Sequence, residues 1–255
     1  MQRVLDIDLD FFLNRIFNSD AEPRGRLDAR DYQVDPPAVA LAYLHENCGL
    51  PTGVATPGLA CERHVDVWFQ WRRMIHAGVL KIPFEVIHVD AHADMGLGNN
   101  SCLYIAEELL AEPVERRRPP IGRDTWCVRD NNFIAYALAC RWIGRLTYVT
   151  HPDCQDDVQW LHMKDFDTRS GFVQMKRYPP GFAERLENFL DVKKLPFEAE
   201  PDIPMTVVPR AGYRTDSAPD FVFLARSPNY TPPTADGLFE ELKKLIDPLP
   251  PRQRR

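Results

Sequence analysis

Acidic and apolar residues alternate in two short segments of the chain. Residues 6–10 read DIDLD, and residues 90–94 read DAHAD. In a β-strand, a period of two places the polar side chains of each segment on one face. Three carboxylates on one face repel one another and resist burial unless a cation lies among them. Carboxylate oxygens combined with imidazole nitrogen suit Mn²⁺, Fe²⁺ or Zn²⁺, so the two segments predict a metal site.

A histidine outside these segments, His64, is a candidate further ligand. It lies 26 residues before Asp90, near the start of a predicted helix. Taken alone, such a histidine is more often an ordinary surface or hydrogen-bonded residue. The alternative for the acidic segments is a solvated edge strand and a surface turn. Two such segments in one chain favour the metal site.

Strand-like and helix-like segments alternate along the chain, which is typical of an α/β protein with a mostly parallel sheet and helices on its faces. The predicted strands cover residues 4–12, 84–92, 146–150, 172–177, 205–208 and 221–225. The predicted helices cover residues 35–49, 62–77, 102–111, 131–143, 182–191 and 236–246. In open α/β sheets, ligands bind at the carboxyl ends of the strands, where residues 90–94 are expected to lie.

Length and composition narrow the class of protein. The chain has 255 residues, and 31 Lys and Arg against 37 Asp and Glu give a net charge of −6, which does not favour a nucleic-acid partner. No apolar stretch is long enough for a transmembrane helix, and the acidic N-terminus does not resemble a signal peptide. The six scattered cysteines indicate reduced thiols, so we expect a cytoplasmic protein with no membrane association. We expect one domain, residues 1–247, and a flexible tail, residues 248–255.

These motifs resemble the signatures of the arginase (ureohydrolase) superfamily. Residues 90–94 resemble its Asp-x-His-x-Asp signature, and residues 8–10, which read DLD, resemble its Asp-x-Asp signature. In ordinary arginases the Asp-x-Asp strand comes second, whereas here it comes first, an order that resembles the bacterial peptide arginases. The segments LARS at 224–227 and YTP at 230–232 resemble the C-terminal segment of that family. The resemblance implies a three-layer α/β/α fold with permuted strand order.

The resemblance also implies an activity, a metal and a partner. Peptide arginases convert arginine residues of ribosomally made peptides into ornithine and release urea. The implied cofactor is two Mn²⁺ ions per chain, which bridge a hydroxide that attacks the guanidinium carbon. The implied partner is an arginine-containing precursor peptide, and relatives often form homo-oligomers. The short segment 95–101 contains no histidine and suits a peptide, which has no free α-groups at that position.

The implied ligands divide into two sets that share two aspartates. One metal would be held by His64, Asp90, Asp94 and Asp8, and the other by Asp90, His92, Asp8 and Asp10. The charges agree with this division, because four carboxylates balance two divalent cations. Asp6 lies on the same face and is either a residue that orients a ligand or a solvated acid. His88 lies deeper in its strand and is expected to be buried and hydrogen-bonded.

Further residues are candidates for catalysis and substrate binding. The candidate catalytic residues are Asp10, Glu62, which could pair with the substrate guanidinium, and His151, which could donate a proton to the leaving amine. Glu62 also suits the N-terminus of a helix. The candidate substrate-binding residues, which could equally cap helices and turns, are Asn131, Asn132, Ser227 and Tyr230.

Two other functions remain open from the sequence. One is a related amidohydrolase, such as a deacetylase with a single zinc ion or a small-molecule ureohydrolase. The other is a metal-stabilised module that binds peptides without turning them over. The number of metals per chain distinguishes the first, and tight peptide binding without turnover would indicate the second.

Overall fold

A computed structural model describes residues 1–17, 25–185 and 188–249, excluding the side chain of residue 185. The main sheet of this described part has eight strands in the order β10-β2-β9-β1-β3-β4-β8-β5, and every strand except β5 is parallel to its neighbour. This confirms the predicted α/β class. The strands are β1 (Arg3–Asp8), β2 (Thr56–Cys61), β3 (Phe84–Asp90), β4 (Ile143–Thr150), β5 (Phe172–Val173), β8 (Ile203–Pro209), β9 (Phe221–Ala225) and β10 (Ile246–Pro248). A separate antiparallel pair comprises β6 (Lys176–Arg177) and β7 (Glu198–Ala199).

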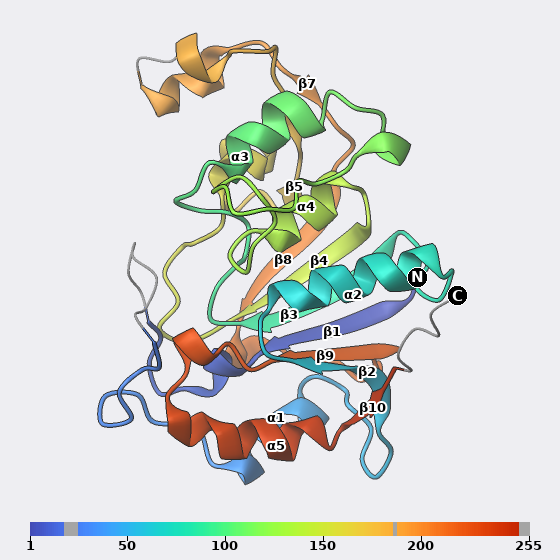
Figure 1. Ribbon diagram of the computed structural model, residues 1–255, viewed down its shortest axis with the longest axis vertical. Helices are drawn as coiled ribbons and strands as arrows, with labels where there is room; N and C mark the ends of the chain where they lie inside the picture. Colours follow the sequence, from blue (N-terminus) through green and yellow to red (C-terminus); the bar gives the residue numbers. More distant parts are fainter. Residues whose placement is uncertain (18–24, 186–187, 250–255) are drawn as a thin grey trace.

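Helices cover both faces of this sheet (Figure 1). One face packs against α1 (Pro37–Glu46) and α5 (Asp236–Lys243), and the other packs against α2 (Val65–His76) and α4 (Phe133–Ala139). Trp68 and Trp71 of α2 are fully buried in the core, and Trp68 stacks on the partly buried Trp142. The three layers bury enough apolar surface to hold polar side chains inside the molecule.

The alternation in β1 determines which layer each side chain meets. Leu5 and Ile7 pack into the core between the sheet and helices α1 and α5, whereas Val4 packs into the core between the sheet and α2. Asp6 and Asp8 share the face of Val4, because successive side chains point to opposite faces of a strand. The register places Asp6 of β1 directly beside His88 of β3. The acidic face is therefore turned into the protein interior.

The predicted strand over residues 4–12 is too long. The strand ends at Asp8, and residues Leu9–Phe12 form a 3₁₀ turn. Pairing with β3 ends at Ile7 and pairing with β9 ends at Asp8. Beyond that point neither neighbour offers ladder partners, so the backbone makes local hydrogen bonds, such as that from the N–H of Leu13 to the carbonyl of Asp10.

Several other predicted elements also differ. The helix over residues 102–111 consists of α3 (Ser101–Tyr104) followed by a π-helical turn, Ile105–Leu109. The strand over residues 172–177 is two short strands, β5 and β6. The helix over residues 182–191 is wrong, because the described residues there form 3₁₀ turns at Ala183–Arg185 and Phe189–Lys194. The helix over residues 236–246 ends at Lys243, and Ile246 begins β10.

The strand β2 was not predicted, because its sequence, TPGLAC, begins like a loop. Its glycine is required by a close backbone approach: a Cβ on Gly58 would lie 1.7 Å from the carbonyl oxygen of Val222 in β9. Pro248, the first residue of the expected tail, belongs to β10, and Leu249 donates a backbone hydrogen bond to Gly58. Residues 250–255 lie outside the described residues.

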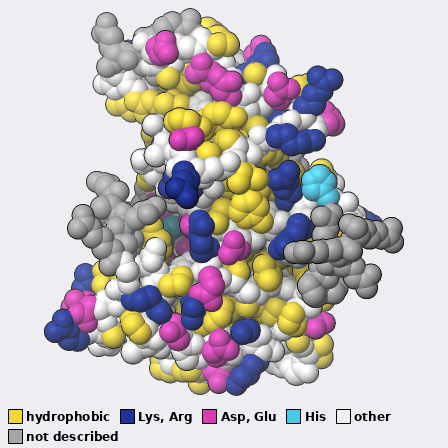
Figure 2. Space-filling model, in the orientation of Figure 1, with side chains coloured by type: hydrophobic (Ala, Val, Ile, Leu, Met, Phe, Trp, Pro, Cys, Tyr) yellow, Lys and Arg dark blue, Asp and Glu magenta, His cyan; other side chains and the backbone are white. Residues whose placement is uncertain are grey.

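Described residues of the segments 101–130 and 151–202 make up much of the part of the molecule above the central strands in Figure 1. This part has a small core of its own, which contains Leu161, Tyr178, Phe182 and Val192. Charged side chains of both signs are interspersed over the face shown in Figure 2. In the described part of the chain, no helix has the length and apolar character needed to cross a membrane.

Candidate metal centre

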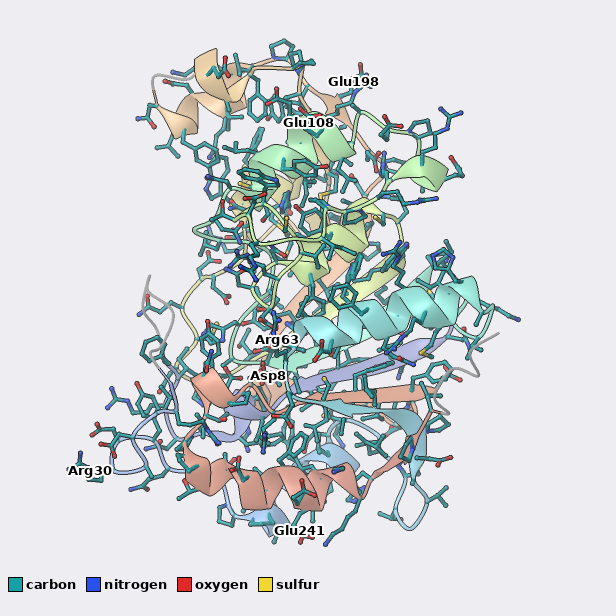
Figure 3. The ribbon with its side chains drawn as sticks, in the orientation of Figure 1. Asp8, Arg30, Arg63, Glu108, Glu198 and Glu241 are labelled. Atoms are coloured by element: carbon teal, nitrogen blue, oxygen red, sulfur yellow. The ribbon has the colours of Figure 1, made fainter. Side chains whose placement is uncertain are left out.

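The residues of the candidate site come from the carboxyl ends of neighbouring strands. Asp8 ends β1, Asp90 ends β3, and Ser227 follows β9. His64 follows β2 and precedes the first residue of α2. In Figure 3, Asp8 lies at the end of β1 close to Arg63 at the start of α2, and both residues line the same cavity. Parallel strands thus bring residues that are far apart in sequence to one edge of the sheet.

The first ligand group surrounds the Nδ1 atom of His64. This atom lies 3.2 Å from Oδ2 of Asp8, 3.1 Å from Oδ2 of Asp90 and 3.1 Å from Oδ2 of Asp94. Metal–ligand bonds of about 2.1 Å separate neighbouring ligand atoms by about 3 Å. The four side chains therefore have the spacing of a ligand shell.

The second group surrounds Nδ1 of His92. It lies 3.2 Å from Oδ2 of Asp10 and 3.9 Å from Oδ1 of Asp90. Asp90 directs one carboxylate oxygen toward each histidine and so belongs to both groups. All six predicted ligands, Asp8, Asp10, His64, Asp90, His92 and Asp94, are thus brought together, and these buried His and Asp clusters could hold a metal ion.

Several polar atoms of the cluster have no hydrogen-bond partner among the described residues. They are Oδ1 of Asp8, Oδ1 of Asp10, Nδ1 of His64 and Oδ2 of Asp90. The short contacts of His64 Nδ1 therefore do not have hydrogen-bond geometry. A buried polar atom without a partner is costly, and here four such atoms lie in one place. A cation among them would supply the missing interactions, so the residues present fit a bound metal.

The electrostatics of the cluster agree with this. Burial raises the pKa of Asp8 and of Asp90, and it raises the pKa of Asp94 to about 7. Burial opposes protonation of His64, but Asp6 and Asp8 raise its pKa well above the usual value. Without a cation, the cluster therefore retains protons near neutral pH, and a metal would displace them.

A second set of contacts orients the ligands. Nε2 of His64 lies 3.1 Å from Oδ1 of Asp6, and Nδ1 of His88 lies 2.9 Å from Oδ2 of the same carboxylate. Burial opposes ionisation of Asp6, but His64 and His88 lower its pKa to about 2. An ionised Asp6 accepts a hydrogen bond from the Nε2–H of His64, which leaves Nδ1 as the atom that faces Asp8, Asp90 and Asp94. Asp6 and His88 are both fully buried, and His88 is hydrogen-bonded as expected.

Backbone conformation supplies further orientation. Asp94 and Ser227 both adopt left-handed backbone conformations, with φ of 48° and 45°. The first turns the chain after β3, which places the Asp94 carboxylate beside His64. The second follows β9, and the hydroxyl of Ser227 donates a 2.6 Å hydrogen bond to Oδ2 of Asp8. Ser227, predicted to bind substrate, therefore also fixes a ligand carboxylate.

A cavity of about 580 Å³ opens onto the cluster. Its lining includes Asp8, Asp10, His64, His92 and Asp94 from the ligand groups. It also includes carboxylates outside those groups and an aromatic wall, in which the rings of Phe17 and His92 both contact Tyr230. Because the volume is that of a small-molecule pocket, the cluster can meet a substrate side chain.

Glu62 and His151, the candidate catalytic residues outside the ligand groups, differ in their position relative to the cavity. Glu62 lines the cavity, but its Oε2 atom accepts a 2.9 Å hydrogen bond from Nε of Arg226. His151 is buried, with Nε2 donating to the carbonyl of Leu13 at 2.8 Å and Nδ1 accepting from the backbone of Asp153 at 3.0 Å. Because His151 does not line the cavity and both ring nitrogens have partners, the geometry offers no support for it as a proton donor.

The candidate substrate-binding residues also divide. Asn131 and Tyr230 line the cavity, as does Ser227. Asn132 is fully buried, where its side chain accepts from the backbone of Arg129 and donates to the carbonyl of Cys127. Asn132 thus fixes the loop before α4 and does not line the cavity.

Several cavity residues could not be predicted from the sequence, among them Phe17, Asp130 and Asp157. Asp130 accepts from the backbone N–H of Val65 at the start of α2, and Asp157 accepts from the backbone N–H of Ala93. Asp130 is a single acid and Asp157 directly follows Asp156, and neither lies in a segment with an alternating pattern. Only the spatial neighbourhood identifies them.

Comparisons with protein-family models, with curated proteins and with solved structures give no match for this chain. Its chemistry must therefore be argued from the geometry of the site.

Proposed function

We propose that this protein is a manganese-dependent hydrolase that converts arginine residues of peptides into ornithine and releases urea. The observation that carries the proposal is the pair of His and carboxylate groups that share Asp90 at the base of a cavity. A site with shared carboxylates and oxygen-rich ligands suits two hard divalent cations such as Mn²⁺. The resemblance of residues 8–10 and 90–94 to arginase signatures supports the same activity.

The proposed ligands are those of the two groups, with Asp8 also assigned to the second ion because the resemblance to arginases implies it. His64, Asp8, Asp90 and Asp94 would hold one ion, and Asp8, Asp10, Asp90 and His92 would hold the other. Held by these residues, two divalent cations would lower the pKa of a water molecule toward neutrality and so supply a nucleophile. A guanidinium carbon needs such a nucleophile, because resonance makes it a poor electrophile.

The reaction consumes one water molecule for each arginine. The C–N bond between the guanidinium carbon and the side-chain nitrogen breaks, the water oxygen stays on that carbon as urea, and the nitrogen leaves as the ammonium group of ornithine. The chain's own residues orient the ligands: Asp6 fixes His64, and Ser227 fixes Asp8. Aromatic and apolar side chains of the cavity, including Phe17, Tyr230 and Met95, are suited to the aliphatic part of the substrate.

The test is incubation of arginine-containing peptides with the protein and Mn²⁺, followed by mass spectrometry. Loss of about 42 Da per modified arginine, the mass of CN₂H₂, together with urea is the expected result. Asp8→Asn and His92→Ala should abolish the mass change, whereas the exposed Asp156→Asn should not. A wild-type protein that binds two metals and modifies no arginine would contradict the proposed reaction while leaving the metal site intact.

A further inference from the structure

Three carboxylates line the cavity without belonging to either ligand group, and two of them already have cationic partners. Glu62 is 56% exposed and pairs with Arg226. Oδ2 of Asp130 lies 3.0 Å from Nη2 of Arg63, and its Oδ1 accepts a 2.8 Å hydrogen bond from the backbone of Val65. These acids are therefore committed to contacts within the protein.

The third carboxylate, Asp157, has only neutral donors around it. Its Oδ2 accepts a 2.6 Å hydrogen bond from the N–H of Ala93 and lies 3.4 Å from the hydroxyl of Tyr148. Its Oδ1 lies 3.5 Å from the thiol of Cys154. In the described part of the chain, no lysine or arginine pairs with Asp157. Of the three described cavity acids outside the ligand groups, Asp157 is therefore the one that remains available to a cation from outside the protein.

Asp157 lies beside both ligand groups. Ala93 lies between His92 and Asp94, which belong to the two different ligand groups. The hydrogen bond from Ala93 therefore fixes the Asp157 carboxylate beside the two ligand groups and at the wall of the same cavity. A planar cation bound to Asp157 would have its central carbon close to both groups.

We propose that Asp157 binds the guanidinium group of the substrate and selects arginine over lysine. This inference rests on the proposed function and deepens it. A guanidinium group is planar and offers five N–H donors in a fixed fork, so it can donate to Asp157 and still present its carbon to the metal groups. An ammonium group has no such carbon. The apolar Met95 and Leu97 in the cavity wall suit the aliphatic stem of the same side chain.

The substitution that tests this is Asp157→Asn. Asparagine keeps an acceptor for the N–H of Ala93 and has almost the same volume, so it removes the charge with little change in packing. The matched control is Asp156→Asn, because Asp156 is the next residue, is exposed, and accepts a hydrogen bond from Thr168 away from this cavity. The rival variant is Glu62→Gln.

Two readouts are needed with the manganese-loaded proteins. The first is the dissociation constant of Nα-acetyl-arginine methylamide by calorimetry, and the second is KM and kcat for urea release from an arginine peptide. For Asp157→Asn we expect both the dissociation constant and KM to rise on the order of 10- to 100-fold. Metal content should stay unchanged, and Asp156→Asn should match the wild type. Nα-acetyl-lysine methylamide should bind weakly to the wild type and to Asp157→Asn alike.

The outcomes separate this inference from the proposed function. Wild-type binding that Asp157→Asn weakens, without any urea release, would support Asp157 as the guanidinium site and contradict the reaction. Urea release with equal KM in wild type and Asp157→Asn would support the reaction and overturn the role of Asp157. Loss of binding in Glu62→Gln alone, or loss of metal in Asp157→Asn, would also overturn it. A wild type that neither binds nor modifies arginine would overturn both.

Discussion

Lys176 and most residues of the His and Asp cluster at the strand ends are buried, but their surroundings differ. Lys176, in the part above the central strands, is almost fully buried, and its ammonium group donates to the carbonyls of Leu161, Met163 and Gln174. Its Nζ atom also lies 4.6 Å from the centre of the Phe166 ring. The protein therefore satisfies this buried charge by itself.

The cluster at the strand ends is different. Within the described part of the chain, four of its buried polar atoms have no hydrogen-bond partner, although carboxylates and imidazoles lie close together there. Lys176 and most residues of the cluster are buried in the same fold, so burial alone does not distinguish a structural charge from a functional one. The distinguishing property is whether the protein supplies all of the partners.

The largest expected effect comes from removing the residue that both ligand groups share. Asp90→Asn should lower urea release by on the order of 1,000-fold or more, because both groups lose a charged ligand. Elemental analysis of the purified variant should show loss of bound metal. Full activity in Asp90→Asn would contradict the assignment of the site.

The next effect concerns Lys176, the buried charge whose partners the protein itself supplies. Lys176→Met should lower the free energy of unfolding by about 2–3 kcal/mol, because it leaves three carbonyls without their donor. The control is Lys164→Met, which removes a surface pair with Asp202 and should cost less than about 1 kcal/mol. Denaturant unfolding measures both, and metal content should be unchanged in each. Loss of metal from Lys176→Met would show that the two regions are coupled.

A smaller effect is expected from Asp6, which touches the ligand His64 but does not belong to either ligand group. Asp6→Asn should weaken metal affinity by about 10- to 100-fold, because the charged acceptor that fixes Nε2 of His64 is lost. Competition with a metal-sensitive dye measures the affinity. An affinity equal to that of the wild type would mean that packing alone orients His64.

The smallest predicted change is a dependence of metal affinity on pH. Burial raises the pKa of Asp94 to about 7, so below that pH the metal-free protein holds a proton on this carboxyl group. A metal must displace that proton, and the affinity should fall by about ten-fold for each pH unit below 7. Above pH 7 the contribution of Asp94 is absent, and the pH dependence that remains comes from His64 and His92. Burial opposes protonation of both histidines, but neighbouring carboxylates raise their pKa values well above the usual value. A metal affinity that does not change between about pH 5 and pH 7, the range just below the pKa of Asp94, would contradict this prediction.

The clustering of the candidate ligand residues could be predicted because the signal is local. A period of two in residues 6–10 and 90–94 specifies which side chains share a face before any partner strand is known. The α/β class follows from the alternation of elements, and the structure confirms it. The end of β1 at Asp8 could not be predicted, because it depends on where β3 and β9 stop pairing.

The missed parts depend on contacts between distant segments. The strand β2 contains Pro57 and Gly58, which locally favour a loop, and only its close approach to Val222 explains the glycine. Asp157 meets Ala93 across 64 positions of the sequence, and no local pattern marks it. His151 was chosen because it follows a strand that ends at the correct edge, but its ring is held by Leu13 and Asp153.

The central claim is that the open cluster at the strand ends is a two-metal centre. It is tested most directly by loading the purified protein with Mn²⁺, removing excess metal, and measuring manganese per chain by elemental analysis. The account predicts two ions per wild-type chain and fewer in His92→Ala, which lacks a ligand of the second group. A wild-type protein that retains no metal, or only a single zinc ion, would contradict it.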